Sequence, residues 1–214
     1  MAAQRLGVSQ AYVSLLERGY RTVSTRMATK LVRLFQLPAT ALPLPAVTAS
    51  LEPTNNQALA EDLGKLGYPG FAYLRTRRPL KNPTEVLLAA LALTDLEARL
   101  AEALPWLLLE FSELDTHRAA ARARLFNLQN RLGFVAALAR LVAEANPRYE
   151  GRAAPLRELE QELRRSRLAK EETLGESLPS PAKRRWLEQN RLPEAEEWGL
   201  LTHWRPEFLR YVSS

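Results

Sequence analysis

The spacing of apolar residues predicts helices along most of the chain. No run of four residues alternates between apolar and polar in the manner of a strand, and the chain has no Asn-Gly or Asp-Gly hairpin signal. After the first 57 residues the apolar spacing follows a helical period over 58–66, 84–93, 95–111, 115–126, 128–145 and 153–169. The predicted fold class is therefore all-α, with a large irregular helical bundle in the C-terminal part.

Two stretches of this predicted bundle differ from ordinary amphipathic helices. Pro105 lies inside 95–111, and we expect it to break that helix in two because proline lacks the amide that a helix interior needs. Between 125 and 142 the apolar residues exceed one helix face, which predicts the central helix of the bundle. The polar residues that precede it would line a recognition surface or cap neighbouring helices, and we favour capping; they are Asn127, Gln129, Asn130 and Arg131.

The first 42 residues predict a smaller helical unit. Residues 2–6 suit the end of a helix that Gly7 terminates in the left-handed conformation. Ser9 is a suitable N-cap for a second helix, which ends at Gly19, and Ser24 is a suitable N-cap for a third. The pattern thus predicts three short helices with tight turns.

A proline-rich stretch separates this unit from the bundle. The segment "PLPAVTASLEPTNNQ" at 43–57 has three prolines, small or polar residues and no periodicity. We predict three parts: a head at 1–42, a linker at 43–57 and a helical body at 58–214 that binds a partner.

The net charge of +6 is concentrated in the head. Residues 1–50 contain six basic side chains and one acid, Glu17, and residues 51–214 add only one further net positive charge. The six are Arg5, Arg18, Arg21, Arg26, Lys30 and Arg33. Such a field suits a polyanion, although charge alone does not decide for nucleic acid.

Composition and motifs give little support to an enzyme or a metalloprotein. The chain has no cysteine and only two histidines, His117 and His203, so we expect no disulfide, no metal site and no cofactor. Asp115 and His117 are two residues apart and would not face each other on a helix. No phosphate loop, glycine-rich fingerprint or nucleophile elbow is present. We therefore expect a binding protein and not an enzyme.

The hydropathy pattern gives no indication of a membrane segment. The most apolar run, "LPWLLLEF" at 104–111, is too short to span a bilayer, and no leader pattern follows Met1. We expect a cytoplasmic protein without a membrane partner.

The stretch "RLGVSQAYVSLLERG" at 5–19 carries the most specific motif. It resembles the lambda-repressor-like (XRE) helix-turn-helix family over about the first 40 residues. The residues that carry the resemblance, in order, are Ala3, Leu6, Gly7, Val8, Ser9, Gln10, Val13, Leu16, Glu17, Gly19, Ala28 and Leu31. The resemblance implies that the second helix lies in the major groove of double-stranded DNA.

Carried over residue by residue, the resemblance also implies which side chains touch DNA. Gln10, Ala11 and Ser14 would read base edges at the start of the second helix. The residues placed for the phosphate backbone are Arg18, Tyr20, Arg21 and Thr22. Glu17 would be structural. A helical hairpin with a coincidental pair of glycines is the alternative.

The family's first helix would precede residue 1, so we expect the head to be N-terminally incomplete, with a native start upstream of Met1. Otherwise another segment must cover the apolar face formed by Val8, Val13, Leu16 and Leu31. Because such heads usually read two half-sites, a homodimer is expected.

The body has a weaker resemblance. The segments "ALPWLLLEF", "LQNRLGFVAALARL" and "WGLLTHWRPEFLRYV" are similar to helical antitoxins encoded beside nucleotidyltransferase-like toxins. This implies an antitoxin that represses its own operon and neutralises a partner toxin. A ligand-responsive repressor and a protein-binding scaffold without DNA binding remain as alternatives.

Two further candidates lie near the end of the chain. The basic run "RRSRLAK" at 164–170 is flanked by glutamates, which favours a solvated helix face over a phosphate contact. Trp186 stands beside two arginines and would serve either as a stacking platform for a base or as a half-buried anchor, which we favour.

Overall fold

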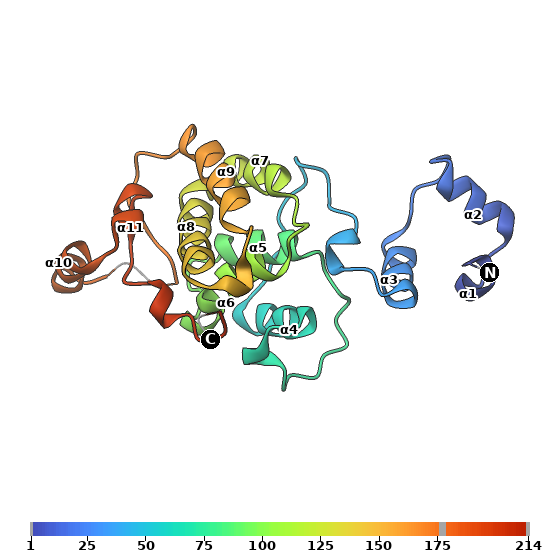
Figure 1. The fold of residues 1–214 in the computed structure, drawn as a ribbon, viewed down its shortest axis with the longest axis horizontal. Coiled ribbons are helices and arrows are strands. Elements are labelled where there is room, and N and C mark those ends of the chain that lie inside the picture. The colour runs from blue at the N-terminus through green and yellow to red at the C-terminus, as the bar shows by residue number, and fades with distance from the viewer. Residues whose placement is uncertain (1, 176–178, 213–214) are drawn as a thin grey trace.

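The fold is all-α apart from one very short pair of strands (Figure 1). It was obtained as a computed structural model, which describes residues 2–175 and 179–212. The described residues contain eleven α-helices: α1 (Ala2–Leu6), α2 (Gln10–Glu17), α3 (Thr25–Phe35), α4 (Asn56–Leu66), α5 (Pro83–Ala92), α6 (Ala98–Glu110), α7 (Thr116–Leu125), α8 (Gln129–Ala145), α9 (Ala153–Arg164), α10 (Pro181–Asn190) and α11 (Pro193–Glu197). Short 3₁₀ helices add η1 (Ala39–Ala41), η2 (Pro69–Phe71), η3 (Pro147–Tyr149) and η4 (Pro206–Phe208).

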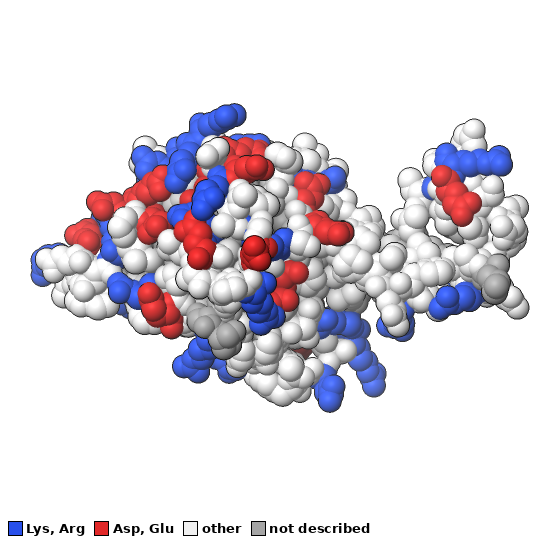
Figure 2. Space-filling view, viewed as in Figure 1, with Lys and Arg blue, Asp and Glu red and all other residues white. Residues whose placement is uncertain are grey.

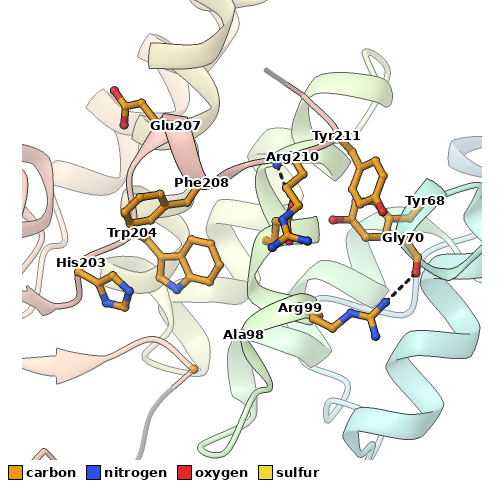
Figure 3. A pocket seen from close by; sticks show the side chains of 12 residues that line it. Tyr68, Gly70, Ala98, Arg99, His203, Trp204, Glu207, Phe208, Arg210 and Tyr211 are labelled. Carbon is orange, nitrogen blue, oxygen red and sulfur yellow. Dashed lines mark hydrogen bonds between the residues drawn. The ribbon is translucent and has the colours of Figure 1, made fainter. Parts of the chain in front are cut away.

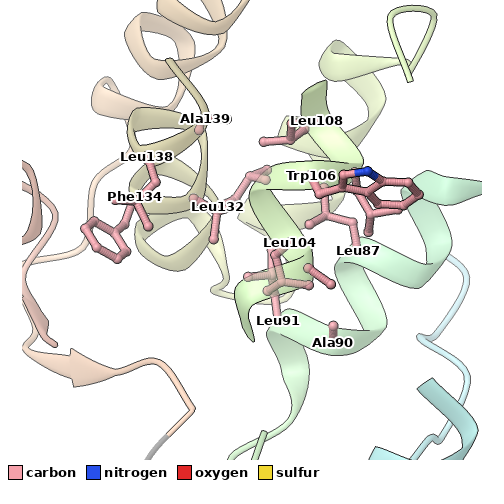
Figure 4. Close-up of a cluster of buried hydrophobic side chains, with 14 of the residues drawn as sticks. Leu87, Ala90, Leu91, Leu104, Trp106, Leu108, Leu132, Phe134, Leu138 and Ala139 are labelled. Atoms are coloured by element: carbon pink, nitrogen blue, oxygen red, sulfur yellow. The ribbon is translucent and has the colours of Figure 1, made fainter. Parts of the chain in front are cut away.

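The main core is built around α8, which packs against α6 and α9. Twelve of the 17 residues of α8 are buried, so the helix contacts other elements on nearly all of its faces. Figure 4 shows Leu132 of α8 on the side of α6 that carries Leu104, with Leu87 of α5 in the same buried cluster. The prediction of a central apolar helix in this region is confirmed.

The chain after α9 folds back onto the end of this core. Strand β1 (Glu172–Thr173) pairs in parallel with β2 (Leu200–Leu201), with Glu172 opposite Leu200. The amide of Asn130 donates to the carbonyl of Leu168 at 3.0 Å and its oxygen accepts from the Leu168 amide at 2.9 Å. Gln129 donates to the Ser166 carbonyl, also at 3.0 Å. The two amides therefore fasten the segment that follows α9 to the first turn of α8, and the role of these residues as helix caps remains a prediction.

Three predictions about the helices of the body are wrong. Pro105 lies inside an uninterrupted α6, which also begins at Ala98 instead of 95. Leu104 and Leu107 on either side are fully buried, so packing compensates for the one helix hydrogen bond that proline cannot make. Helix α9 ends at Arg164 and not at 169, because Ser166 takes the Leu163 carbonyl with both its amide and its hydroxyl.

The proline-rich segment lies along the body and contains no α-helix or strand before α4 begins at Asn56. Arg118 of α7 donates to the carbonyls of Leu44 and Pro45. Arg122, the next turn of the same helix, donates to the Ala49 carbonyl at 3.0 Å and pairs with Glu85. The arginines of α7 thus hold the segment through its backbone carbonyls. Because every residue has such a carbonyl, these contacts do not depend on the side chains of the segment. The division of the chain into head, linker and body remains a prediction.

The head lies at one end of the molecule in Figure 1 and meets the body through η1. Asn82 at the start of α5 donates to the carbonyls of Thr40 at 3.1 Å and Leu42 at 2.8 Å. Leu42 packs with Ala28 and Val32 of α3 in a small apolar cluster of its own. None of the helices in the described part of the chain has the length and hydrophobicity that a bilayer-spanning helix requires.

Candidate nucleic-acid interface

The turn between α1 and α2 has the geometry that the sequence predicts. Gly7 has φ +66°, its amide donates to the Gln4 carbonyl, and the Val8 amide donates to the Ala3 carbonyl at 3.0 Å. This pair of hydrogen bonds is typical of a helix that ends at a glycine in the left-handed conformation. The two amides satisfy the last free carbonyls of the helix. The Ser9 side chain then accepts from the Tyr12 amide at 3.2 Å, so it is the N-cap of α2.

Helix α2 ends in the same way. Gly19 has φ +72°, and its amide donates to the Leu16 carbonyl at 3.0 Å. The amides of Tyr20 and Arg21 both donate to the Leu15 carbonyl. The start of the loop after α2 is therefore fixed to the last turn of the helix. This fixes the backbone from which the loop side chains extend.

A small apolar cluster holds the three helices together. Ala3, Leu6 and Val13 form its buried centre. The partly buried residues that pack against it are Val8, Met27, Leu31 and Leu34. Val13 is 8% exposed and Leu16 is half-buried, so α1 and α3 cover most of the apolar face that the sequence shows on α2.

Two of the six basic side chains of the head tie α3 to α1. Lys30 donates from Nζ to the Leu6 carbonyl at 2.6 Å, at the end of α1 where the helix dipole favours a cation. Arg5 donates to the Leu34 carbonyl at 2.9 Å and lies over the Phe35 ring. The sequence suggests both residues only as parts of a positive field, whereas the structure assigns them a packing role.

The predicted base readers lie on the exposed side of α2. Gln10 and Ala11 are exposed at its first turn. Ser14 is half-buried and lies one turn after Gln10, on the same side of the helix. Figure 1 shows α2 at the outer end of the head, where no element of the body lies beside it.

The predicted backbone contacts follow directly after α2. Arg18, Tyr20, Arg21 and Thr22 are all exposed, Tyr20 to 74%. The Arg21 guanidinium lies 5.5 Å from the centre of the Tyr12 ring on α2, a cation–π contact between the loop and the helix. In Figure 2 the head carries several basic side chains and a single acidic one, whereas both signs are interspersed over the body.

Sequence reasoning missed Tyr12. Its position between Ala11 and Val13 on α2 does not indicate a role of its own. In the structure its half-buried ring contacts the guanidinium of Arg21, nine residues further along the chain. An aromatic residue near the start of a helix that a basic loop follows is the signal that would have indicated this pair.

Comparison with known protein families gives a match for the head. Residues 1–42 match the model of a helix-turn-helix family. This agrees with the geometry of α1 and α2 and supports binding of double-stranded DNA by the head. Neither the curated proteins nor the solved structures gave a match for the chain.

The other candidates from the sequence have structural partners. Asp115 caps α7 by accepting from the Arg118 amide, and His117 lies 2.9 Å from a Glu162 carboxylate oxygen. No group of three or more His, Asp or Glu side chains in the described residues has the arrangement of a metal site. Arg164 in the basic run pairs with Glu197 at 2.5 Å. Trp186 is 49% exposed and lies edge-on to His203.

Proposed function

We propose that the protein is a sequence-specific DNA-binding transcriptional regulator that acts by binding and not by catalysis. The observation that carries this proposal is the geometry of α2. Its first turn presents Gln10 and Ala11 to solvent, while Ser9 and Gly19 fix its two ends. A helix that is held at both ends and exposed along one side is what insertion into a major groove requires.

Each predicted contact has a stated chemistry. Gln10 pairs through its amide with an adenine edge, Ala11 meets a thymine methyl group, and Ser14 donates to either kind of base edge. The loop side chains contact phosphates of the DNA backbone. The affinity that their positive charges contribute decreases as the salt concentration rises. These four are Arg18, Tyr20, Arg21 and Thr22. Two heads on two half-sites would make the functional unit a homodimer.

The experiment begins with selection of a binding site from random-sequence duplexes, followed by titration of variants on that site by fluorescence anisotropy. Gln10→Ala should cost about 1 to 3 kcal/mol and relax selectivity at one base position. Arg21→Ala should weaken binding to all sequences and lower the salt slope by about 1. The exposed body residues Gln161 and Arg165 supply matched alanine controls, which should behave as wild type. Wild-type affinity in both head variants would contradict the proposal.

For the finer role we propose an antitoxin that represses its own operon and neutralises a nucleotidyltransferase-like toxin. The similarity of three body segments to helical antitoxins supports it. Large apolar side chains exposed on the body, among them Leu125, Trp186 and Phe208, offer contact area for a protein partner.

Co-expression tests this role. The product of the adjacent gene should arrest growth when expressed alone, and the full chain should restore growth and co-purify with it in fixed stoichiometry. A double variant, Leu125→Ser with Trp186→Ser, should lose both effects and keep DNA binding. An adjacent gene product without toxicity or without a complex would refute the antitoxin role and leave the DNA-binding proposal intact.

A further inference from the structure

A large cavity lies far from the head, between η2, α6 and the C-terminal segment. Its volume is about 580 Å³, within the range of pockets that hold small organic molecules. Residues from four distant parts of the chain form it, from Tyr68 to Tyr211, with Arg99 of α6 between them (Figure 3). The DNA-binding proposal does not use this cavity, although one of its lining residues, Phe208, is among those named above as contact area for a protein partner.

Aromatic rings form two opposite sides of the cavity. Trp204 and Phe208 lie on one side in Figure 3, next to His203. Tyr68 and Tyr211 lie on the other, edge to face with ring centres 5.2 Å apart. A flat ring placed between these sides would contact aromatic surface on both.

Two guanidinium groups lie between the aromatic sides. Arg99 is held in place by the Gly70 carbonyl at 3.2 Å and by the Phe71 ring beneath it. The backbone amide of Arg210 donates to Glu102 at 2.8 Å, but its guanidinium has no hydrogen bond or ion pair to any described residue. No described residue therefore competes with a ligand for this guanidinium.

Acidic residues do not neutralise this end of the cavity fully. Among the described residues, Glu102 is the one carboxylate near the two arginines, whereas the carboxylate of Glu207 points to the far edge in Figure 3. The described side chains at the arginine end therefore have an excess of one positive charge. A planar guanidinium pair is suited to a carboxylate, which it can bind through two parallel hydrogen bonds.

Buried polar atoms without partners point to the same place. Tyr68 is 1% exposed, and its hydroxyl has no hydrogen-bond partner among the described residues. Burial raises the pKa of this hydroxyl above its usual range, so it stays protonated and able to donate. Nδ1 of His203 is likewise buried and unpaired. Unpaired buried polar groups are uncommon because they cost stability, and a polar ligand atom would satisfy them.

We propose that this cavity binds a small planar aromatic carboxylate, with its ring between Trp204 and Tyr211 and its carboxylate on Arg99 and Arg210. Tyr68 donates to the same end of the ligand. The site is independent of the DNA-binding head, so the proposal stands or falls separately from the function proposed above.

Isothermal titration calorimetry on the full chain tests the proposal with three probes: benzoate, naphthalene-2-carboxylate and indole-3-carboxylate. Each is compared with its own carboxamide, which has the same shape without the charge. At least one carboxylate should bind about tenfold or more tightly than its carboxamide. Arg210→Ala should remove that preference, and Arg165→Ala, which deletes the same charge from the exposed end of α9, should keep it.

Tyr68→Phe separates a ligand contact from a structural role. Deleting an unpaired buried hydroxyl should leave thermal stability equal or higher, because no hydrogen bond is lost. The same change should weaken the best carboxylate several-fold. The proposal is overturned if no carboxylate exceeds its carboxamide, or if Arg210→Ala leaves the preference unchanged.

Discussion

The close contact between Gly133 and Trp198 allows a quantitative test of how the C-terminal segment packs on α8. A Cβ atom added to Gly133 would lie 2.5 Å from Cε3 and Cζ3 of Trp198. Carbon atoms in contact prefer a separation of about 3.5–4.0 Å, so the ring or the helix would have to move by about 1 Å. Trp198 is 0% exposed, and the surrounding core therefore resists that movement.

The magnitude follows from two opposing effects of Gly133→Ala. Overpacking a core costs about 1–3 kcal/mol, and the contact here involves several atoms of a fully buried ring, which favours the upper half of that range. Alanine has the better helix propensity, by up to about 1 kcal/mol. We expect the free energy of unfolding to fall by about 2 kcal/mol.

Urea denaturation followed by circular dichroism measures this effect in two backgrounds. In the wild-type background Gly133→Ala should destabilise as stated. In a Trp198→Leu background the clash is absent, so the same change should stabilise by up to about 1 kcal/mol through helix propensity. A stabilised Gly133→Ala protein, or an equal effect in both backgrounds, would refute the packing described for α8 and the C-terminal segment.

Three further predictions concern caps, buried charge and pH. Ser9→Ala should cost about 1 kcal/mol of stability, because it removes the N-cap of α2, and should weaken DNA binding in the same titration that tests Gln10. Arg122→Met should destabilise by about 3–5 kcal/mol in thermal melts, because it leaves Glu85 unpaired, whereas the double change with Glu85→Leu should recover most of that loss. Hydrogen bonds from Gln57 and Thr76 hold the pKa of Glu61 below its ordinary value, so Glu61 adds stability above the unfolded-state pKa and loses that contribution as pH falls through the folded pKa. Thr76→Val should raise the Glu61 pKa in an NMR titration, and an unchanged pKa would contradict the hydrogen bond.

The sequence predicts the head well because its signals are local. Gly7 and Gly19 end helices in the left-handed conformation, and Ser9 and Ser24 cap the helices that follow them. Each of these roles depends on residues within five positions. The body helices α4 to α9 are predicted for a similar reason, since apolar period is also a local property, whereas α10 and α11 lie outside the predicted helical ranges.

What the sequence could not predict depends on contacts between distant residues. Pro105 remains in a continuous helix because the residues around it are buried by other elements. Lys30 caps α1 from 24 positions away. The cavity joins Tyr68, Arg99 and Arg210, and no local pattern marks these residues as neighbours.

The specificity ratio of DNA binding tests the central claim most directly. It is the affinity of the full chain for its selected duplex divided by its affinity for a scrambled duplex, both at the same salt concentration. If α2 reads bases, the ratio should reach about 10³ or more, and Gln10→Ala should lower it while Arg21→Ala leaves it nearly unchanged. Equal affinity for both duplexes, or a ratio that does not respond to Gln10, would contradict the account.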